Sequence, residues 1–147
     1  MKRKFLYEIL DELAQAEDFE AAFFDALDYV RGFKDLVDVI YNKNYNYEVD
    51  KSIFYTKPRS DRENGGFPSS WLDVVVILKN KLVRSTITSP RCPDYYIKAC
   101  KNCNIKDVDI LNYAIYHRNF PGFQGARKKF ITNALKKYYG DDNGETF

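Results

Sequence analysis

The chain has 147 residues, 45% of them hydrophobic and 30% charged, which is the composition of one soluble globular domain. Its longest apolar run, Val74–Leu78, falls far short of the roughly 20 residues that a membrane-spanning helix needs, so we expect no membrane partner. The net charge of +2 hides an asymmetry, because residues 1–75 carry a balance of −5 and residues 76–147 a balance of +7, which makes the second half a candidate footprint for a polyanion.

Helical spacing of apolar residues begins at the N-terminus and continues through the first third of the chain. It predicts a first helix over about 3–16 and a second helix that starts after Asp18 as its N-cap. Gly32 interrupts the pattern, and a third helix follows that carries Phe33, Leu36, Val37, Ile40 and Tyr41. Residues 41–68 then read as one long irregular connection rich in Asn, Gly and Pro.

The second half of the chain continues the helical pattern. A fourth helix is expected over about 70–86, capped by Ser69 or Ser70, and a short one near 94–103. Asn104 or Asp107 starts the next helix, and a last helix with Phe130 on its apolar side ends at Gly140. The predicted fold is all-α: a single-domain irregular bundle of about six to seven helices over residues 1–140, with 141–147 as a flexible C-terminal tail.

Residues suited to catalysis or to metal binding are few. His117 is the single histidine, no nucleophile-elbow or P-loop motif is present, and we place His117 at a helix C-terminus. Cys92, Cys100, Cys103 and His117 contain the ligands of a Cys3His zinc site, but the expected glycines are absent and free buried thiols are favoured. We expect no enzymatic activity, no cofactor and no metal.

The localisation expected from these residues is cytosolic. Three cysteines cannot all pair within one chain, which favours a reducing compartment. Glu8, Asp11 and Glu12 interrupt the apolar region that a signal peptide requires.

The stretch HRNFPGFQGARKKF, residues 117–130, is the strongest candidate for binding. A helix N-terminus presents unpaired N–H groups and the positive end of the helix dipole, which suit a phosphate. Each candidate contact offers a positive charge, an amide donor or a closely approachable glycine backbone. The candidates are Arg118, Gly122, Gln124, Gly125, Arg127, Lys128 and Lys129. Basic residues in the first turn oppose the dipole unless an anion sits there. The alternative is an ordinary corner between two helices with exposed lysines.

A second candidate contact lies in the connection after the third helix. Lys43 and Asn44 stand among Tyr41, Tyr45 and Tyr47, an arrangement that can bind phosphates and stack on sugars or bases. Tyrosines also pack loops onto a protein, so this alternative stays open.

The order of three segments resembles a known family. These are FLYEILDELAQA, DLVDVIYNKNYNYEVDK and DVDILNYAIYHRN followed by GARKKFITNAL. Together they resemble the α-helical DNA-binding domain that precedes the catalytic core of ATP-dependent DNA ligases, particularly the compact type of T-even phages, and short uncharacterised proteins of T4-like phages and cyanophages. The resemblance covers about residues 5–138. The sequence lacks the nucleotidyltransferase core of the ligases, with its Lys-x-Asp-Gly motif.

The resemblance implies backbone contacts to duplex DNA. Carried onto this chain, the implied contact residues are Lys43, Asn44, Arg118, Gly125, Ala126 and Arg127. It implies a freestanding, non-catalytic phage protein of the host cytoplasm that binds double-stranded DNA without regard to sequence. The alternative is a protein-interaction module that inhibits or redirects a host replication or defence protein.

Overall fold

The computed structural model describes residues 4–45, 67–83 and 92–147, and in these ranges the chain is helical without a strand. The expected all-α class is confirmed. The described part contains seven α-helices and one π-helical segment: α1 (Leu6–Gln15), α2 (Phe19–Tyr29), α3 (Phe33–Tyr41), α5 (Ser70–Ile77), η2 (Leu78–Val83), α6 (Cys92–Cys100), α7 (Ile105–His117) and α8 (Ala126–Tyr139). None of the described helices is long and apolar enough to cross a membrane.

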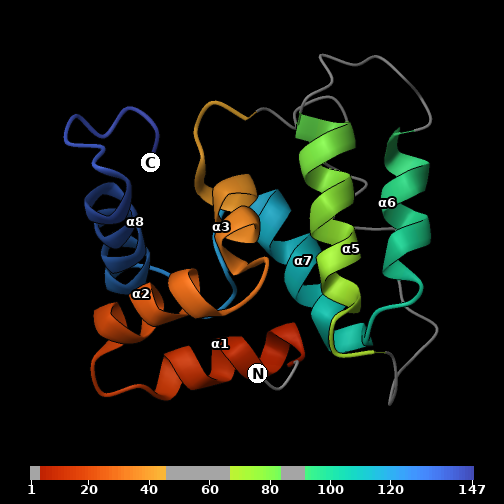
Figure 1. Ribbon diagram of the computed structural model, residues 1–147, viewed down its shortest axis with the longest axis horizontal. Coiled ribbons are helices and arrows are strands. Elements are labelled where there is room, and N and C mark those ends of the chain that lie inside the picture. The colour runs from red at the N-terminus through yellow and green to blue at the C-terminus, as the bar shows by residue number, and fades with distance from the viewer. Residues whose placement is uncertain (1–3, 46–66, 84–91) are drawn as a thin grey trace.

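The helices surround one core, and their arrangement is visible in Figure 1. Helix α1 runs along one side of the molecule, α2 packs against α8 at one end, and α5 packs against α6 at the other. Helices α3 and α7 lie between these two pairs. The core joins buried side chains from both halves of the sequence, such as Phe23 and Phe33 with Leu111 and Ile131. The N-terminal and C-terminal parts therefore form one folded unit across the described residues.

Two helix starts follow from local sequence, and a third does not. Asp18 caps α2 by accepting a hydrogen bond from the N–H of Ala21 (3.1 Å), and Asn104 caps α7 by accepting one from Lys106 (2.9 Å). Asp107, the other candidate start of α7, lies within that helix and is buried. Its carboxylate instead accepts the N–H groups of Leu6 and Tyr7 at 3.1 and 2.9 Å, so it caps α1 from about a hundred residues away.

The helix expected over about 70–86 changes its winding midway. It begins at Ser70 as predicted, but the side chain of the N-cap residue Ser69 forms no capping hydrogen bond. The helix remains α-helical to Ile77 and continues as the π-helix η2 to Val83. Val74 is fully buried, whereas Val76 is 53% exposed. Phe130, predicted on the apolar side of the last helix, is likewise 53% exposed, since Ile131, Ala134 and Leu135 already fill the core beneath α8.

The C-terminal residues, expected as a flexible tail, are folded back onto the molecule. Phe147 is only 4% exposed, and its ring stacks on Tyr139 with the centroids 5.1 Å apart. The carboxylate of Asp141 accepts the N–H groups of Thr146 (3.1 Å) and Phe147 (3.0 Å), and these bonds hold its pKa below the ordinary range. The expectation was wrong because it considered the polar residues 141–146 and not Phe147, whose apolar ring is buried.

Candidate nucleic-acid interface

Helix α8 begins at an exposed and uncapped N-terminus. Gly125 is the N-cap residue and has no side chain to accept a hydrogen bond, and the first turn contains no acidic residue. Gly125, Ala126, Lys128 and Lys129 are exposed. The first N–H groups of the helix therefore face solvent without a capping partner, as in helix ends that bind anions.

The two glycines before α8 adopt backbone conformations that other residues avoid. Gly122 has φ +82°, and Gly125 has φ +62° with ψ −123°. Apart from the glycine and its two chain neighbours, no heavy atom lies within 4 Å of the position that a Cβ would occupy at either residue. The conformation of the corner explains the glycines by itself, and the open space around them leaves the backbone accessible.

Lys128 and Lys129 are the two cations of this corner that face solvent. Neither forms an ion pair with any residue in the described ranges, and both stand in the first turn of α8, where a positive charge opposes the helix dipole. Gln124 is also exposed, and its Nε2 donates to the hydroxyl of Tyr113 (2.6 Å). The side-chain oxygen of Gln124 takes no part in that bond.

Arg127, expected at the same surface, is turned inward. Its guanidinium carbon lies 4.6 Å from the ring centroid of Phe19 and 5.8 Å from that of Phe123, and Nη2 donates to the carbonyl of Ala14 (3.2 Å). Nη1 is buried. The residue therefore joins the start of α8 to the C-terminal turn of α1, where a cation is favourable for the dipole. This orientation differs from the expected phosphate contact.

Arg118 and Lys43 also bind groups of the protein itself. Arg118 ends α7 in a left-handed conformation, with φ 58°, and its Nη2 donates to the carbonyl of Asn42. Lys43 donates through Nζ to the carbonyl of Gly144 (2.8 Å) and through its N–H to that of Thr146 (2.8 Å). These two predicted phosphate contacts thus stabilise the C-terminal end of α3 and the residues after α8. Asn44 is exposed, and its N–H donates to Asn42 Oδ1 (2.9 Å).

The corner between α7 and α8 is held by a buried polar network that the sequence pattern did not reveal. The Tyr41 hydroxyl donates to Asn119 Oδ1 (2.7 Å) and accepts the N–H of Phe120 (3.0 Å). Asn119 Nδ2 donates to the carbonyl of Phe123 (2.8 Å), and Phe120 stacks on Phe33 with centroids 6.0 Å apart. Burial raises the pKa of Tyr41 far above its ordinary value, so the hydroxyl keeps its proton. The corner is thereby fixed in shape before any ligand binds.

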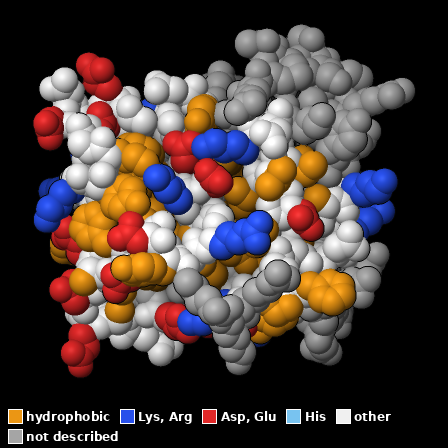
Figure 2. All heavy atoms as spheres, viewed as in Figure 1, with side chains coloured by type: hydrophobic (Ala, Val, Ile, Leu, Met, Phe, Trp, Pro, Cys, Tyr) orange, Lys and Arg blue, Asp and Glu red, His pale blue; other side chains and the backbone are white. Residues whose placement is uncertain are grey.

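Among the described residues, part of the positive charge of the second half lies beside acidic side chains of the first half. Helix α8 packs against the acidic α2, where Lys137 Nζ lies 3.6 Å from Glu20 and the Tyr138 hydroxyl donates to Asp28 (2.8 Å). Acidic and basic side chains are interspersed on the face drawn in Figure 2. The excess positive charge is therefore partly balanced by neighbouring carboxylates. The case for a phosphate site depends on the residues at the start of α8 and not on the net charge of the second half.

The cysteines and His117 were the candidate ligands of a zinc site. Cys100 and Cys103 are buried, and burial raises the pKa of both thiols. His117 is exposed at the last position of α7 as expected, with its ring 4.1 Å from that of Tyr113. Within the described residues, no three His, Cys, Asp or Glu side chains are grouped to hold a metal ion. The side chain of Cys92 lies outside the described ones.

No protein-family model, curated protein or solved structure matches this chain. The assignment of a role to the corner before α8 therefore depends on the geometry of its own residues.

Proposed function

We propose that this chain is a non-catalytic protein that binds the sugar-phosphate backbone of duplex DNA at the N-terminus of α8. The observation that supports it is the combination of an uncapped, exposed helix start with two unpaired lysines, Lys128 and Lys129, in its first turn. A phosphate placed there would accept the free N–H groups and offset the charge that the helix dipole disfavours.

The contact set is smaller than the sequence suggested. Lys128 and Lys129 supply the charge, the backbone at Gly122 and Gly125 supplies access, and Gln124 supplies a polar side chain. Arg118, Arg127 and Lys43 act by holding the corner and its neighbours in place, since each already donates to a backbone carbonyl. Asn44 and Ala126 are exposed and add surface.

The contacts proposed for Lys128, Lys129 and the backbone at Gly122 and Gly125 are to phosphates. Contacts to phosphate position a protein without specifying sequence. The proposal is therefore a sequence-independent duplex binder. The all-helical fold agrees with the ligase-domain resemblance at the level of fold class alone.

The experiment is a fluorescence-anisotropy titration with intact, nicked and single-stranded probes of equal length over a range of salt concentrations. With two to three phosphates neutralised, the log–log slope of affinity against salt is about −2 to −3 for duplex DNA. The ligase resemblance predicts tightest binding to the nicked probe. Binding that is absent at low salt, or that does not respond to salt, would contradict the proposal.

The second candidate function, a protein-interaction module, is supported by a different observation. An apolar groove with exposed aromatic residues lies between α1 and α5, away from α8. If this function holds, the chain binds no DNA at low salt and a purified protein partner protects Tyr29 and Phe67 from solvent.

A further inference from the structure

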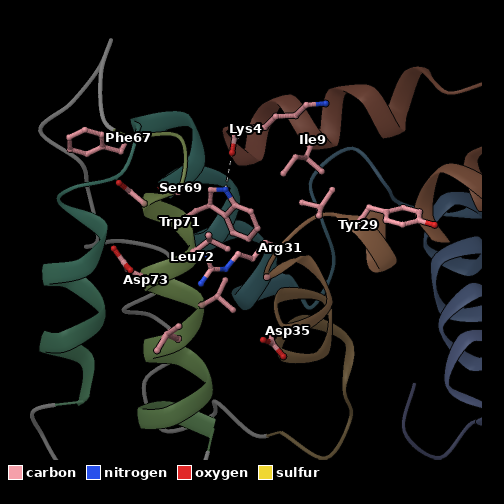
Figure 3. A pocket seen from close by; sticks show the side chains of 15 residues that line it. Lys4, Ile9, Tyr29, Arg31, Asp35, Phe67, Ser69, Trp71, Leu72 and Asp73 are labelled. Atoms are coloured by element: carbon pink, nitrogen blue, oxygen red, sulfur yellow. Dashed lines mark hydrogen bonds between the residues drawn. The ribbon is translucent and has the colours of Figure 1, made fainter. Parts of the chain in front are cut away.

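A groove of about 900 Å³ lies between α1, the turn from α2 to α3, and the first two turns of α5 (Figure 3). Its floor includes the ring of Trp71, which is 2% exposed and donates through its indole N–H to the carbonyl of Lys4 (3.1 Å). Tyr29, Phe67 and Val76 stand at the rim, with exposures of 65%, 75% and 53%. The floor is therefore fixed while the apolar rim is open to water.

Exposed apolar surface is concentrated at this groove. Five large hydrophobic side chains are exposed among the described residues, and three of them line it. Single exposed hydrophobic residues need no explanation, whereas several that line one concave surface are typical of a protein–protein interface.

The charges at the rim suggest which protein binds. Four charged residues line the groove, two of each sign. Lys4 is paired with Glu12 at 2.7 Å, and Asp35 lies 3.6 Å from Lys79. Arg31 and Asp73 are exposed, and neither forms an ion pair within the ranges that the structure describes. The groove thus offers one unpaired cation and one unpaired anion beside an apolar rim.

A surface with this arrangement is complementary to itself. In a two-fold symmetric dimer every contact between two different residues occurs twice, once in each direction. A cation and an anion on the same face can therefore form two ion pairs across the interface. A partner of single charge would leave one of the two unpaired. We propose that the groove binds a second copy of this chain, with Arg31 of each protomer facing Asp73 of the partner subunit and the apolar rims packed between them.

The size of the groove predicts a weak dimer. Fifteen residues line it, fewer than the roughly 20–30 residues on each side of a standard stable interface. We expect a weak dimer, with a dissociation constant of about 10–100 µM (about −5.5 to −7 kcal/mol), so that the chain is mainly monomeric when dilute. No residue of α8 lines the groove, so this proposal is independent of DNA binding.

Sedimentation equilibrium of the whole chain over about 5–500 µM tests the proposal. The wild type is expected to change from the 17.3 kDa monomer toward twice that mass. Arg31→Asp and Asp73→Arg should each raise the dissociation constant tenfold or more, because each places like charges opposite one another twice. Phe67→Ser should also weaken the dimer by removing an apolar contact.

Mixing the two charge variants gives the sharpest result. In a heterodimer of Arg31→Asp with Asp73→Arg, both contacts have opposite charges again, so association should return to near the wild-type value. The matched controls are Lys101→Asp, Asp25→Arg and Phe130→Ser, which change exposed residues outside the groove and should leave the mass unchanged.

Three results would overturn the proposal. The first is a wild type that stays monomeric at every concentration, which would leave the groove to a different protein. The second is a dimer that does not respond to the groove variants, and the third is a mixture that fails to associate. Circular dichroism of every variant verifies that the fold is retained.

Discussion

The guanidinium of Arg127 donates to the carbonyl of Ala14, 113 residues earlier in the chain, and joins the start of α8 to the end of α1. The contact separates three consecutive basic residues into two roles. Arg127 lies over Phe19 and stabilises the fold, whereas Lys128 and Lys129 remain exposed.

Arg127→Ala should therefore lower stability. The change removes a charged hydrogen bond and a cation–π contact, and we expect a loss of about 1–3 kcal/mol in the free energy of unfolding. Urea denaturation measures it. Lys128→Ala is the matched control and should stay within about 0.5 kcal/mol of the wild type, because its side chain is exposed. Equal stabilities of the two variants would contradict the inward position of Arg127.

Tyr41→Phe should loosen the corner before α8. The variant keeps the ring but removes the hydroxyl between Asn119 and the N–H of Phe120, which leaves two buried polar groups unpaired. We expect a loss of about 2–3 kcal/mol in thermal or urea denaturation. Tyr138→Phe removes a more accessible hydroxyl bonded to Asp28 and should cost less than about 1 kcal/mol. A Tyr41→Phe protein as stable as the Tyr138→Phe protein would refute the network.

Asp107 gives the fold a pH dependence. Burial raises its pKa from 3.8 to about 6, although the N–H groups of Tyr7 and Leu6 favour the charged form. The folded chain thus holds a proton that the unfolded chain has lost, so the free energy of unfolding falls as pH rises from about 4 to 6.5, by at most roughly 3 kcal/mol. Asp107→Asn cannot titrate and should lack this fall.

The measurement is urea denaturation of both proteins at intervals between pH 4 and pH 7. Other carboxylates titrate equally in the two proteins, so the difference between them isolates Asp107. The wild type should lose stability relative to Asp107→Asn as pH rises. A relative gain would mean that the two backbone hydrogen bonds outweigh burial.

Phe147→Ala tests whether the last residues belong to the folded domain. The ring is buried against Tyr139, and its removal should lower stability by about 1.5–3 kcal/mol and release Thr146 from Lys43. Hydrogen exchange at the N–H of Lys43 should accelerate in the variant. Asn143→Ala, at an exposed position of the same segment, is the control and should leave both quantities unchanged.

Local sequence was sufficient for much of the fold, as the helix starts show. Asp18 and Gly140 act within a few residues of their own positions, and both took the predicted roles at helix ends. Asp107 does not start α7, which was one of its two predicted alternatives. It binds the N–H groups of Leu6 and Tyr7, which are brought to it only by the packing of α1 on α7. The long helix expected from 70 changes to π-helical winding after Ile77, which a pattern of apolar spacing does not specify.

The candidate site was less predictable for the same reason. The glycines, Gln124, Lys128 and Lys129 are exposed around one corner, as the spacing suggested. Arg118 and Lys43 instead bind carbonyls of Asn42 and Gly144. A long basic side chain can reach solvent or a carbonyl equally well, and its direction depends on tertiary neighbours that one sequence does not reveal.

The measurement that tests the account most directly is the salt dependence of duplex DNA binding by a Lys128→Ala/Lys129→Ala double variant. Each phosphate contact contributes about 0.9 to the log–log slope, so the variant should bind more weakly and its slope should be about 1.8 shallower than that of the wild type. Lys98→Ala/Lys101→Ala removes the same charge from exposed positions in α6 and directly after it, and should leave the slope within about 0.3 of the wild type. Equal slopes for the two double variants would contradict a phosphate site at the start of α8.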